Sequence, residues 1–271
     1  MPQVSAEIGV FGGSGFYSLL DDPGADIVEV AVDTPYGAPS APLVVGRIAG
    51  RGVAFLPRHG RDHRFPPHRI PYRANVWAMH HLGVRQLIAP CAAGSLQRAV
   101  APGDFVVVDQ LVDRTSGRVQ TFYDDRAVHV AFADPYCPKG RAAAVRAARD
   151  EGITAHDGGT MVVIEGPRFS TRAESRSYAA AGWSVINMTG HPEAVLAREL
   201  ALCYTSVALI TDYDAGPADD PDVPGVTLEV VLRVFAENNA RLRGLMHRVV
   251  ELLPDGARDC PCATALDGMG L

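Results

Sequence analysis

Short apolar runs alternate along this chain with longer segments of helical pattern, and this alternation limits the folds open to it. The apolar runs, rich in β-branched residues, occupy positions 8–11, 27–32, 43–48, 53–56, 86–89, 105–108, 161–164, 184–188 and 204–210. The helical patterns occupy positions 72–82, 139–151, 171–181, 192–201 and 226–253. Such runs are typical of buried strands, and strands that alternate with helices favour a mixed, largely parallel sheet. We therefore expect a single α/β sandwich, with one domain spanning residues 1–271.

The composition argues against two classes of partner. Hydrophobic residues make up 47% of the chain and charged residues 21%, and the formal net charge is −6. A nucleic-acid or anionic-membrane surface would require a clustered basic face, so we expect neither partner. The first apolar run, at 8–11, is too short for a signal peptide, and no later run is long enough to span a bilayer.

The cysteines indicate a reducing compartment. They number five, an odd count, and most stand in apolar surroundings: Cys91, Cys137, Cys203, Cys260 and Cys262. This usage suits reduced thiols and predicts a cytoplasmic protein. The close spacing of Cys260-Pro261-Cys262 would strain a disulfide, so we expect a structural, reduced pair there.

Two segments rich in chain-breaking residues are predicted loops. Residues 61–71 hold three prolines, and residues 214–225 combine Gly and Pro with four Asp. The second segment is our candidate for a mobile lid.

Glycine and cationic residues follow two of the predicted strands. Gly12-Gly13-Ser14-Gly15 comes after the first strand, where small residues let backbone amides approach an anion, although a plain tight turn explains the same residues. The full dinucleotide-binding fingerprint is absent. Arg58-His59-Gly60-Arg61-x-His63 follows another strand and concentrates phosphate-binding donors, with a solvated surface loop as the alternative.

Two strand-to-helix junctions carry residues suited to a nucleoside. Phe169 precedes a capping-box pair, Thr171 and Glu174, and could stack on a base or pack in the core. Met188 and Thr189 precede a helix that starts with Pro192 and Glu193. A hydroxyl and amides at a helix start favour an anion, whereas core filler and a plain N-cap are the alternatives.

Two carboxyls close the last predicted strand. In a strand, residues two apart point to one face, so Asp212 and Asp214 should share a site. Close carboxyls at the edge of an apolar core repel, and one of them then holds its proton more tightly. The pair could therefore supply a general acid, the alternative being two solvated aspartates that open an acidic loop.

Taken in order, these motifs resemble the trimeric purine nucleoside phosphorylases, and most closely their 5'-methylthioadenosine phosphorylase branch. The likeness rests on GGSGFY, RHGRDH, AAGSL, FYDDRAVHVAFADPYCP, IEGPRFSTRAES, INMTGHPEAVLARE and TDYDAG. The resemblance implies a three-layer α/β domain with a twisted mixed sheet flanked by helices. It also implies a homotrimer with active sites near the subunit contacts, and no metal or organic cofactor, inorganic phosphate being a co-substrate.

Position within the motifs assigns the site residues that the resemblance implies. The phosphate site would comprise Ser14, Arg58, His59, Ala92 and Thr189. The nucleoside site would comprise Met188 under the ribose and Phe169, Asp212 and Asp214 around the purine. The wall around the 5' substituent would comprise Leu228, Val231 and Leu232, with His129 lent by a neighbouring subunit. Two residues depart from the family pattern: Cys91 replaces a phosphate donor, and His191 replaces a smaller or apolar residue near the purine.

The implied reaction is phosphorolysis of 5'-methylthioadenosine to adenine and 5-methylthioribose 1-phosphate. A protonated Asp212 would donate toward N7, and Asp214 would accept from the 6-amino group. A 6-oxopurine nucleoside phosphorylase, acting on inosine, guanosine or methylthioinosine, would instead carry an amide at the first carboxylate of TDYD. A non-catalytic nucleotide-binding module would need neither the paired carboxylates nor the RHG donors.

Overall fold

Eleven strands form one sheet in the part of the chain that the structure, a computed structural model, describes: residues 4–13, 16, 19–20, 26–216, 223 and 225–270. The strands are β1 (Ile8–Gly12), β2 (Val28–Val30), β3 (Leu43–Ile48), β4 (Arg51–Pro57), β5 (Gln86–Ser95), β6 (Phe105–Val107), β7 (Gln110–Arg114), β8 (Ala155–Asp157), β9 (Thr160–Ile164), β10 (Val185–Asn187) and β11 (Cys203–Asp212). The helices are η1 (Pro67–Arg69), α1 (Tyr72–His81), α2 (Pro138–Asp150), α3 (Arg172–Ala180), α4 (Gly190–Glu199) and α5 (Leu228–Leu252).

The sheet branches at β5. Its main path runs β2-β3-β4-β1-β5-β10-β9-β7, and a second path leaves β5 through β11 to β6 and β8. β4, β1, β5 and β11 are parallel neighbours, so their carboxyl ends meet at one edge, whereas β10 runs antiparallel to β5. In open α/β sheets, ligands bind outside such carboxyl ends.

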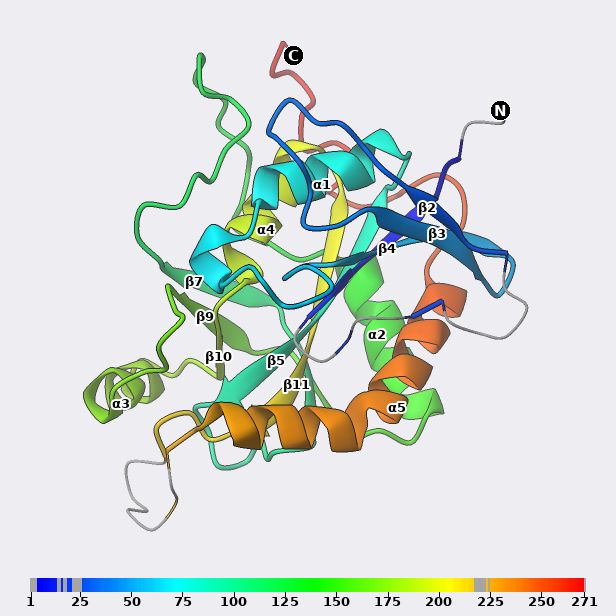
Figure 1. The fold of residues 1–271 in the computed structure, drawn as a ribbon. Coiled ribbons are helices and arrows are strands. Elements are labelled where there is room, and N and C mark those ends of the chain that lie inside the picture. Colours follow the sequence, from blue (N-terminus) through cyan, green and yellow to red (C-terminus); the bar gives the residue numbers. More distant parts are fainter. Residues whose placement is uncertain are drawn as a thin grey trace.

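Helices cover both faces of the sheet. One core lies under α1 and α4, and a second lies under α2 and α5, which gives three layers (Figure 1). β11 contributes alternate residues to the two cores: Tyr204, Ala208 and Ile210 to the first, and Val207 and Leu209 to the second. Because both faces are covered, such strands are apolar at nearly every position, which is why the sequence predicted them.

The expected α/β fold with a mixed sheet flanked by helices is confirmed. All nine predicted apolar runs contain strands, and the five helical patterns correspond to α1–α5 with ends shifted by a few residues. The capping box of α3 is present, with the Thr171 hydroxyl and the Glu174 carboxylate each accepting from the other's backbone N–H. The sequence missed β7 and β8, which pair in the sheet but are half-buried and partly polar, and η1, which lies in the predicted loop 61–71.

Two predictions concern the organisation of the chain. A single domain over residues 1–271 stays a prediction, although every described strand belongs to this sheet. Among the described residues, no helix combines the length and apolar character needed to cross a membrane.

Candidate active site

A cavity of about 430 Å³ opens where the parallel strands end. This volume lies in the range of small-molecule sites. Ten of the predicted site residues line it: Arg58, His59, Ala92, Phe169, Met188, Thr189, Asp212, Asp214, Leu228 and Val231. They come from β5, β11 and α5 and from the segments that follow β4, β9, β10 and β11, so the fold brings distant segments to one place.

The Arg58 guanidinium is the buried cation of the site. Only 1% of its surface is exposed, and its Nε and Nη2 donate to the two carboxylate oxygens of Glu193 at 2.6 and 2.9 Å. The Tyr204 hydroxyl donates to the same carboxylate at 2.7 Å. Burial alone would lower the pKa of Arg58, but the Glu193 carboxylate outweighs it and raises the pKa above its ordinary value. Arg58 therefore stays charged, and the bidentate ion pair fixes its position.

His59 is neutral in the protein without ligand. Burial lowers its pKa to about 3, and the charge of Arg58 adds to this effect. Its Nδ1 lies 2.9 Å from the Phe65 carbonyl oxygen, which can only accept, so Nδ1 carries the ring proton. The other nitrogen, Nε2, is then an acceptor. The prediction that His59 offers a free donor at neutral pH is therefore wrong, because its one N–H is used within the loop.

The hydroxyl of Thr189 is free of a capping role. Thr189 is the N-cap residue of α4, yet its side chain makes no cap hydrogen bond, and its Oγ1 lies 3.5 Å from Asn187 Nδ2. The Asn187 Oδ1 accepts from the backbone N–H groups of Thr189 and Gly190, both at 3.3 Å. The prediction of free helix-start amides for an anion is wrong at these two positions. The Thr189 hydroxyl remains as a donor on the cavity wall.

Small residues let the Arg58 end of the cavity form. Gly13 follows β1, and a Cβ there would lie 3.1 Å from the Pro90 carbonyl oxygen and 3.4 Å from Arg58 Nη1. Ala92 offers a methyl group and its backbone. Cys91, the departure from the family pattern, does line the cavity, and burial raises the pKa of its thiol. A neutral thiol thus stands beside the cation.

Asp212 ends β11 as a buried acid. Its Oδ2 accepts from the Thr211 hydroxyl at 2.7 Å, and its Oδ1 accepts from the backbone N–H of Asp214 at 2.7 Å. Burial nevertheless raises its pKa to about 6. The β5–β11 register shifts between Ile210 and Asp212, a bulge that leaves Thr211 unmatched at the cavity edge.

Asp214 reaches the cavity from a turn. Its φ is +50°, so it lies beyond the strand, and the expectation that both acids project from one strand face is wrong. They meet because the turn folds back. Burial raises the pKa of Asp214 as well, and Oδ2 of Asp214 has no hydrogen-bond partner among the described residues. Burial is the main cause of both shifts, and the repulsion that the sequence suggested contributes less to the pKa of Asp212.

Phe169 and Met188 lie along the middle of the cavity. Phe169 is half-buried on the cavity wall rather than packed in a core, which favours base stacking over the alternative. Met188 follows β10. Gly166, whose φ is +64°, leaves it room, because a Cβ at this glycine would lie 2.5 Å from the Met188 sulfur.

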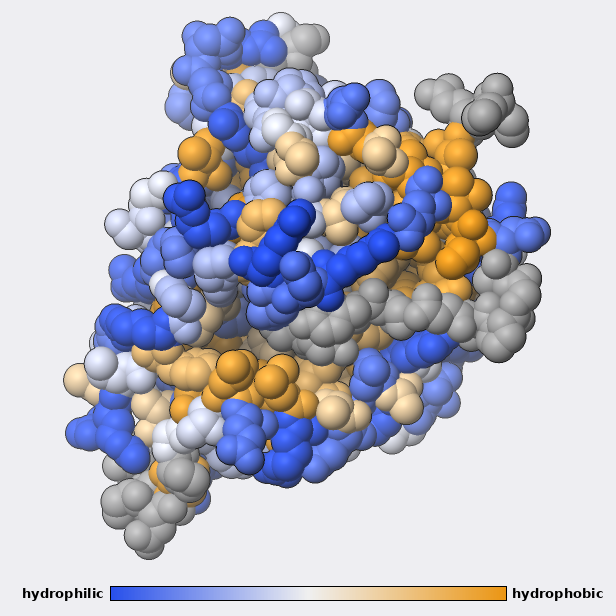
Figure 2. Space-filling model, viewed as in Figure 1, coloured by the Kyte–Doolittle hydropathy of each residue, from blue (hydrophilic) through white to orange (hydrophobic). Residues whose placement is uncertain are grey.

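The start of α5 forms an apolar rim. Leu228 and Val231 line the cavity, whereas Leu232, 45% exposed, does not belong to its described lining. Figure 2 shows apolar side chains gathered along this helix beside a hollow in the surface. All three residues lie on the predicted helix, but only two of them line the described cavity.

Four further predictions have different outcomes. Ser14 and most of the expected lid, residues 214–225, lie outside the described residues. His129 is exposed on the long loop between β7 and α2, which projects from the body, and is absent from the described lining (Figure 1). His191 does not line the cavity: its Nε2 lies 3.3 Å from Asp113 Oδ2, so its expected position near the purine is wrong.

Several residues that build the site were not among the predicted site residues. Glu193 holds Arg58, Asn187 organises Thr189, and Gly94 makes room for the acids, since its Cβ would lie 2.8 Å from Asp212 Oδ1. Motif position could have pointed to Asn187 and Gly94, which stand inside INMTG and AAGSL. Nothing in the sequence pairs Glu193 with an arginine 135 residues away.

Comparisons with known proteins give one consistent family. The model of the phosphorylase superfamily matches residues 7–251. An S-methyl-5'-thioadenosine phosphorylase of Mycolicibacterium smegmatis is 61% identical over 97% of this chain and 96% of its own. A purine nucleoside phosphorylase of Streptomyces coelicolor is 58% identical over 98% and 96%. The solved methylthioadenosine phosphorylase of Schistosoma mansoni, in complex with adenine, superposes with a TM-score of 0.85 at 37% identity, covering 92% of each chain.

Proposed function

Because the chain belongs to the phosphorylase superfamily, we propose that it cleaves 5'-methylthioadenosine with inorganic phosphate, giving adenine and 5-methylthioribose 1-phosphate. One observation carries this proposal: a single cavity joins a buried arginine to two buried carboxyls and ends at an apolar rim. A phosphate, a purine and a methylthio group would each meet matching chemistry there. The relatives named for this reaction support the same substrate.

Phosphate would bind at the Arg58 end. Glu193 holds Nε and Nη2 of Arg58, and Nη1 donates one N–H to the Pro90 carbonyl oxygen at 3.4 Å. The second N–H of Nη1 and the positive charge of the guanidinium would then serve the phosphate, because Arg58 lines the cavity. The Thr189 hydroxyl can donate as well. The bare Nε2 of neutral His59 would accept the remaining proton of hydrogen phosphate. This arrangement suits an anion that still carries one P–O–H group.

The base would bind at the carboxyl end. Adenine has a bare N7 and a 6-amino group, so it requires one donor and one acceptor. Asp212, with a pKa near 6, can hold a proton for N7, and the unpartnered Oδ2 of Asp214 can accept from the amino group. Phe169 would stack on the ring.

The sugar would span the two ends. Met188 lies where it can support the ribose, and Leu228 and Val231 would surround the methylthio group. An apolar wall favours a thioether over the hydroxyl of an ordinary nucleoside, because a buried hydroxyl without a partner costs free energy.

The proposed chemistry places charge where the site can stabilise it. Breaking the glycosidic bond leaves positive charge on the sugar and negative charge on the purine. Phosphate beside C1' would stabilise the sugar cation and then form the new C1'–O bond. The electrons of the broken bond would pass to the base, which takes a proton at N7 from Asp212. Solvent would then return a proton to Asp212, and the reaction draws on no metal or organic cofactor.

A second candidate follows from one relative, the purine nucleoside phosphorylase of Streptomyces coelicolor. An enzyme for 6-oxopurines, such as inosine, guanosine or methylthioinosine, must donate to the 6-oxygen, which an ionised carboxylate repels. The retained acid pair therefore favours 6-aminopurines. A module that binds nucleotides without chemistry would have no need for buried, proton-holding carboxyls.

The test is a panel of nucleosides assayed with and without phosphate. We expect release of free adenine from 5'-methylthioadenosine only when phosphate is present, with a higher kcat/KM than for adenosine, inosine or methylthioinosine. Preference for a 6-oxopurine would favour the second candidate. No free base from any nucleoside would contradict catalysis altogether.

We further propose a homotrimer in the cytoplasm. The exposed His129 on the projecting loop suits a residue lent to the site of a neighbouring subunit, and heterologous contacts close naturally into rings. Sedimentation at the assay concentration tests this arrangement, since a fully active monomer would contradict it. The five cysteines, all free, suit a reducing compartment.

A further inference from the structure

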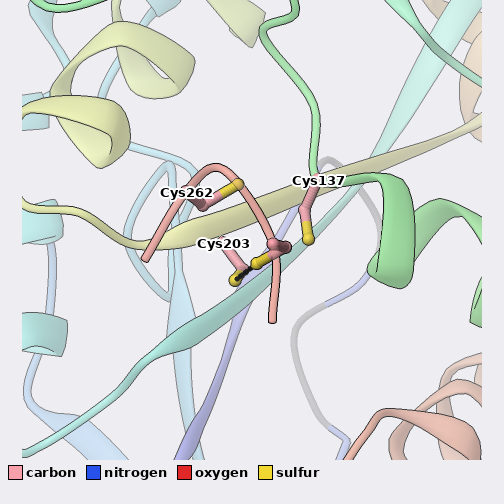
Figure 3. Close-up of side chains that lie close together, drawn as sticks. Cys137, Cys203 and Cys262 are labelled. Atoms are coloured by element: carbon pink, nitrogen blue, oxygen red, sulfur yellow. Dashed lines mark hydrogen bonds between the residues drawn. The ribbon is translucent and has the colours of Figure 1, made fainter. Parts of the chain in front are cut away.

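Four buried cysteines meet at a point away from the cavity. Their sulfur atoms all lie within 4.8 Å of one another, and no other residue type belongs to this cluster: Cys137, Cys203, Cys260 and Cys262. Cys203 begins β11 and Asp212 ends it, so the full length of that strand separates the thiols from the carboxyl pair. Figure 3 shows how the start of α2, the start of β11 and the C-terminal segment converge there.

The spacing of the thiols fits a tetrahedral metal centre. Zinc binds thiolate sulfur at about 2.3 Å, which places the sulfurs of a tetrahedral site about 3.8 Å apart. The Sγ atoms of Cys203 and Cys260 are 3.4 Å apart, and none of the other pairs exceeds 4.8 Å. Shifts of a few tenths of an ångström to about one ångström would therefore bring all four to bonding distance of one ion.

Positive charge surrounds the cluster. Arg258 Nη1 lies 3.7 Å from Cys203 Sγ. Cys137 is the N-cap residue of α2, where the positive end of the helix favours a thiolate. Four thiolates around a divalent cation leave a net charge of −2, which this arginine and the helix end offset in part.

The C-terminal segment needs such an anchor. Its described residues beyond α5 form turns but no helix or strand, and Cys260 and Cys262 are 7% and 1% exposed within a core made only of cysteines. Four small side chains bury little apolar area, so their mutual packing stabilises the segment weakly. A metal bound through both ends of the Cys260-Pro261-Cys262 turn would hold it firmly.

We propose that Cys137, Cys203, Cys260 and Cys262 bind one Zn²⁺ ion in a structural, tetrahedral site. Binding converts four thiols to thiolates and releases four protons. The site would extend the predicted reduced pair at Cys260 and Cys262, and it departs from the expectation of a chain without metal. The site takes no part in the reaction proposed above, and the zinc proposal does not depend on that reaction.

A series of contacts connects the cysteine cluster to the Arg58 end of the cavity. Tyr136 and Tyr204, which directly adjoin Cys137 and Cys203, stack with their ring centroids 5.8 Å apart. The Tyr204 hydroxyl holds Glu193, which in turn holds Arg58. Zinc at the cluster would thus stiffen the support of the predicted phosphate site.

The test measures zinc in the full-length protein, purified under reducing conditions without chelator from zinc-supplemented cells. We expect about one zinc per chain by plasma mass spectrometry in the wild type, and less than about one-tenth in Cys262→Ser and Cys260→Ser. Cys91→Ser, which removes the one cysteine outside the cluster, is the matched control and should keep the metal.

Cobalt supplies a measurement that needs no variant. Wild-type protein stripped of metal and given Co²⁺ should show the sulfur-to-cobalt charge-transfer and visible bands of a tetrahedral thiolate site. Wild type that neither retains zinc nor yields this spectrum would overturn the proposal, whether its cysteines prove to be free thiols or disulfides. Zinc retained at full stoichiometry by both serine variants would overturn it too.

Discussion

The backbone N–H of Asp214 donates to Oδ1 of Asp212 at 2.7 Å, so the two acids of the cavity are joined through the main chain of one turn. The left-handed conformation of Asp214 makes this contact possible. It places an acid with a pKa of about 6 beside one whose Oδ2 lacks a partner among the described residues. One acid is thus suited to hold a proton and the other to accept a hydrogen bond.

Replacing Asp212 by Asn should stabilise the ligand-free protein, and more so as the pH rises. Below pH 3.8 the folded and unfolded chains both hold the Asp212 proton, so Asp212 does not lower the free energy of unfolding there. Between pH 3.8 and about 6 the unfolded chain releases the proton while the folded chain retains it, which destabilises the folded wild type. Above pH 6 this destabilisation of the folded wild type reaches its full value, at most about 3 kcal/mol.

Urea unfolding of Asp212→Asn and wild type between pH 4.5 and 7.5 measures this effect. The control is Asp62→Asn, an exposed acid in the loop after β4, whose difference from wild type should stay within about 0.5 kcal/mol across the range. A difference for Asp212→Asn that does not change with pH would show that its proton is held no more tightly than in the unfolded chain.

Replacing Glu193 by Gln should destabilise the protein strongly. Gln can still accept from Arg58 and Tyr204, but it leaves the buried guanidinium without a counter-charge, which costs about 3–5 kcal/mol. The free energy of unfolding checks this. The matched control is Glu237→Gln in the exposed Arg233–Glu237 pair of α5, which should cost less than about 1 kcal/mol.

A Glu193→Gln protein as stable as Glu237→Gln would mean that the Arg58–Glu193 pair contributes little to the fold. Phosphate KM should also rise in Glu193→Gln, because the position of Arg58 is no longer fixed. Glu237→Gln should leave phosphate KM unchanged.

The sequence predicted the parts of this fold that depend on local pattern. β5 and β11 were found because both of their faces are buried, and the α3 start because its capping box is contiguous. β7 and β8 were missed because their burial depends on neighbours in the sheet rather than on their own residues.

The site was predicted by motif position, but much of its physics was not. Both acids and Arg58 were identified, whereas the turn that unites the acids and the Glu193 that holds the arginine depend on tertiary contacts. The neutral state of His59 follows from its burial and from the Phe65 carbonyl, and neither can be read from the RHG motif.

Replacing Gly94 by Ala should impair catalysis without unfolding the protein. The added methyl group would lie 2.8 Å from Asp212 Oδ1 and 3.2 Å from the Asp214 nitrogen, so both acids must move. A displacement near 1 Å at reacting groups can cost about 100-fold in rate, and we expect a loss of that order in kcat/KM. Gly244→Ala in α5 is the control: its nearest atom would be 3.5 Å away, so activity should be unchanged. Equal activity in the two variants would contradict the tight fit at the acids.

Base choice gives the sharpest test of Asp212. Adenine needs a donor at N7 and an acceptor at its amino group, which Asp212 and Asp214 can supply as one protonated and one ionised carboxyl. A 6-oxopurine presents an acceptor at position 6, next to the acceptor N7, and the NH₂ of an amide at position 212 could donate to both. We therefore expect Asp212→Asn to lose far more kcat/KM on methylthioadenosine than on methylthioinosine, and activity on methylthioinosine can rise.

The size of this change follows from unmatched polar groups in the closed site. Each costs about 1–3 kcal/mol when buried, which corresponds to a selectivity change of about 5- to 150-fold. If Asp212 only capped the turn at Asp214, the substitution would act through stability and reduce both activities equally. The pH series with the same variant separates these cases, because a variant that is at least as stable as wild type at pH 7 cannot owe a selective loss to unfolding. An unchanged ratio of kcat/KM for the two nucleosides would end the assignment of Asp212 as the acid that reads the purine.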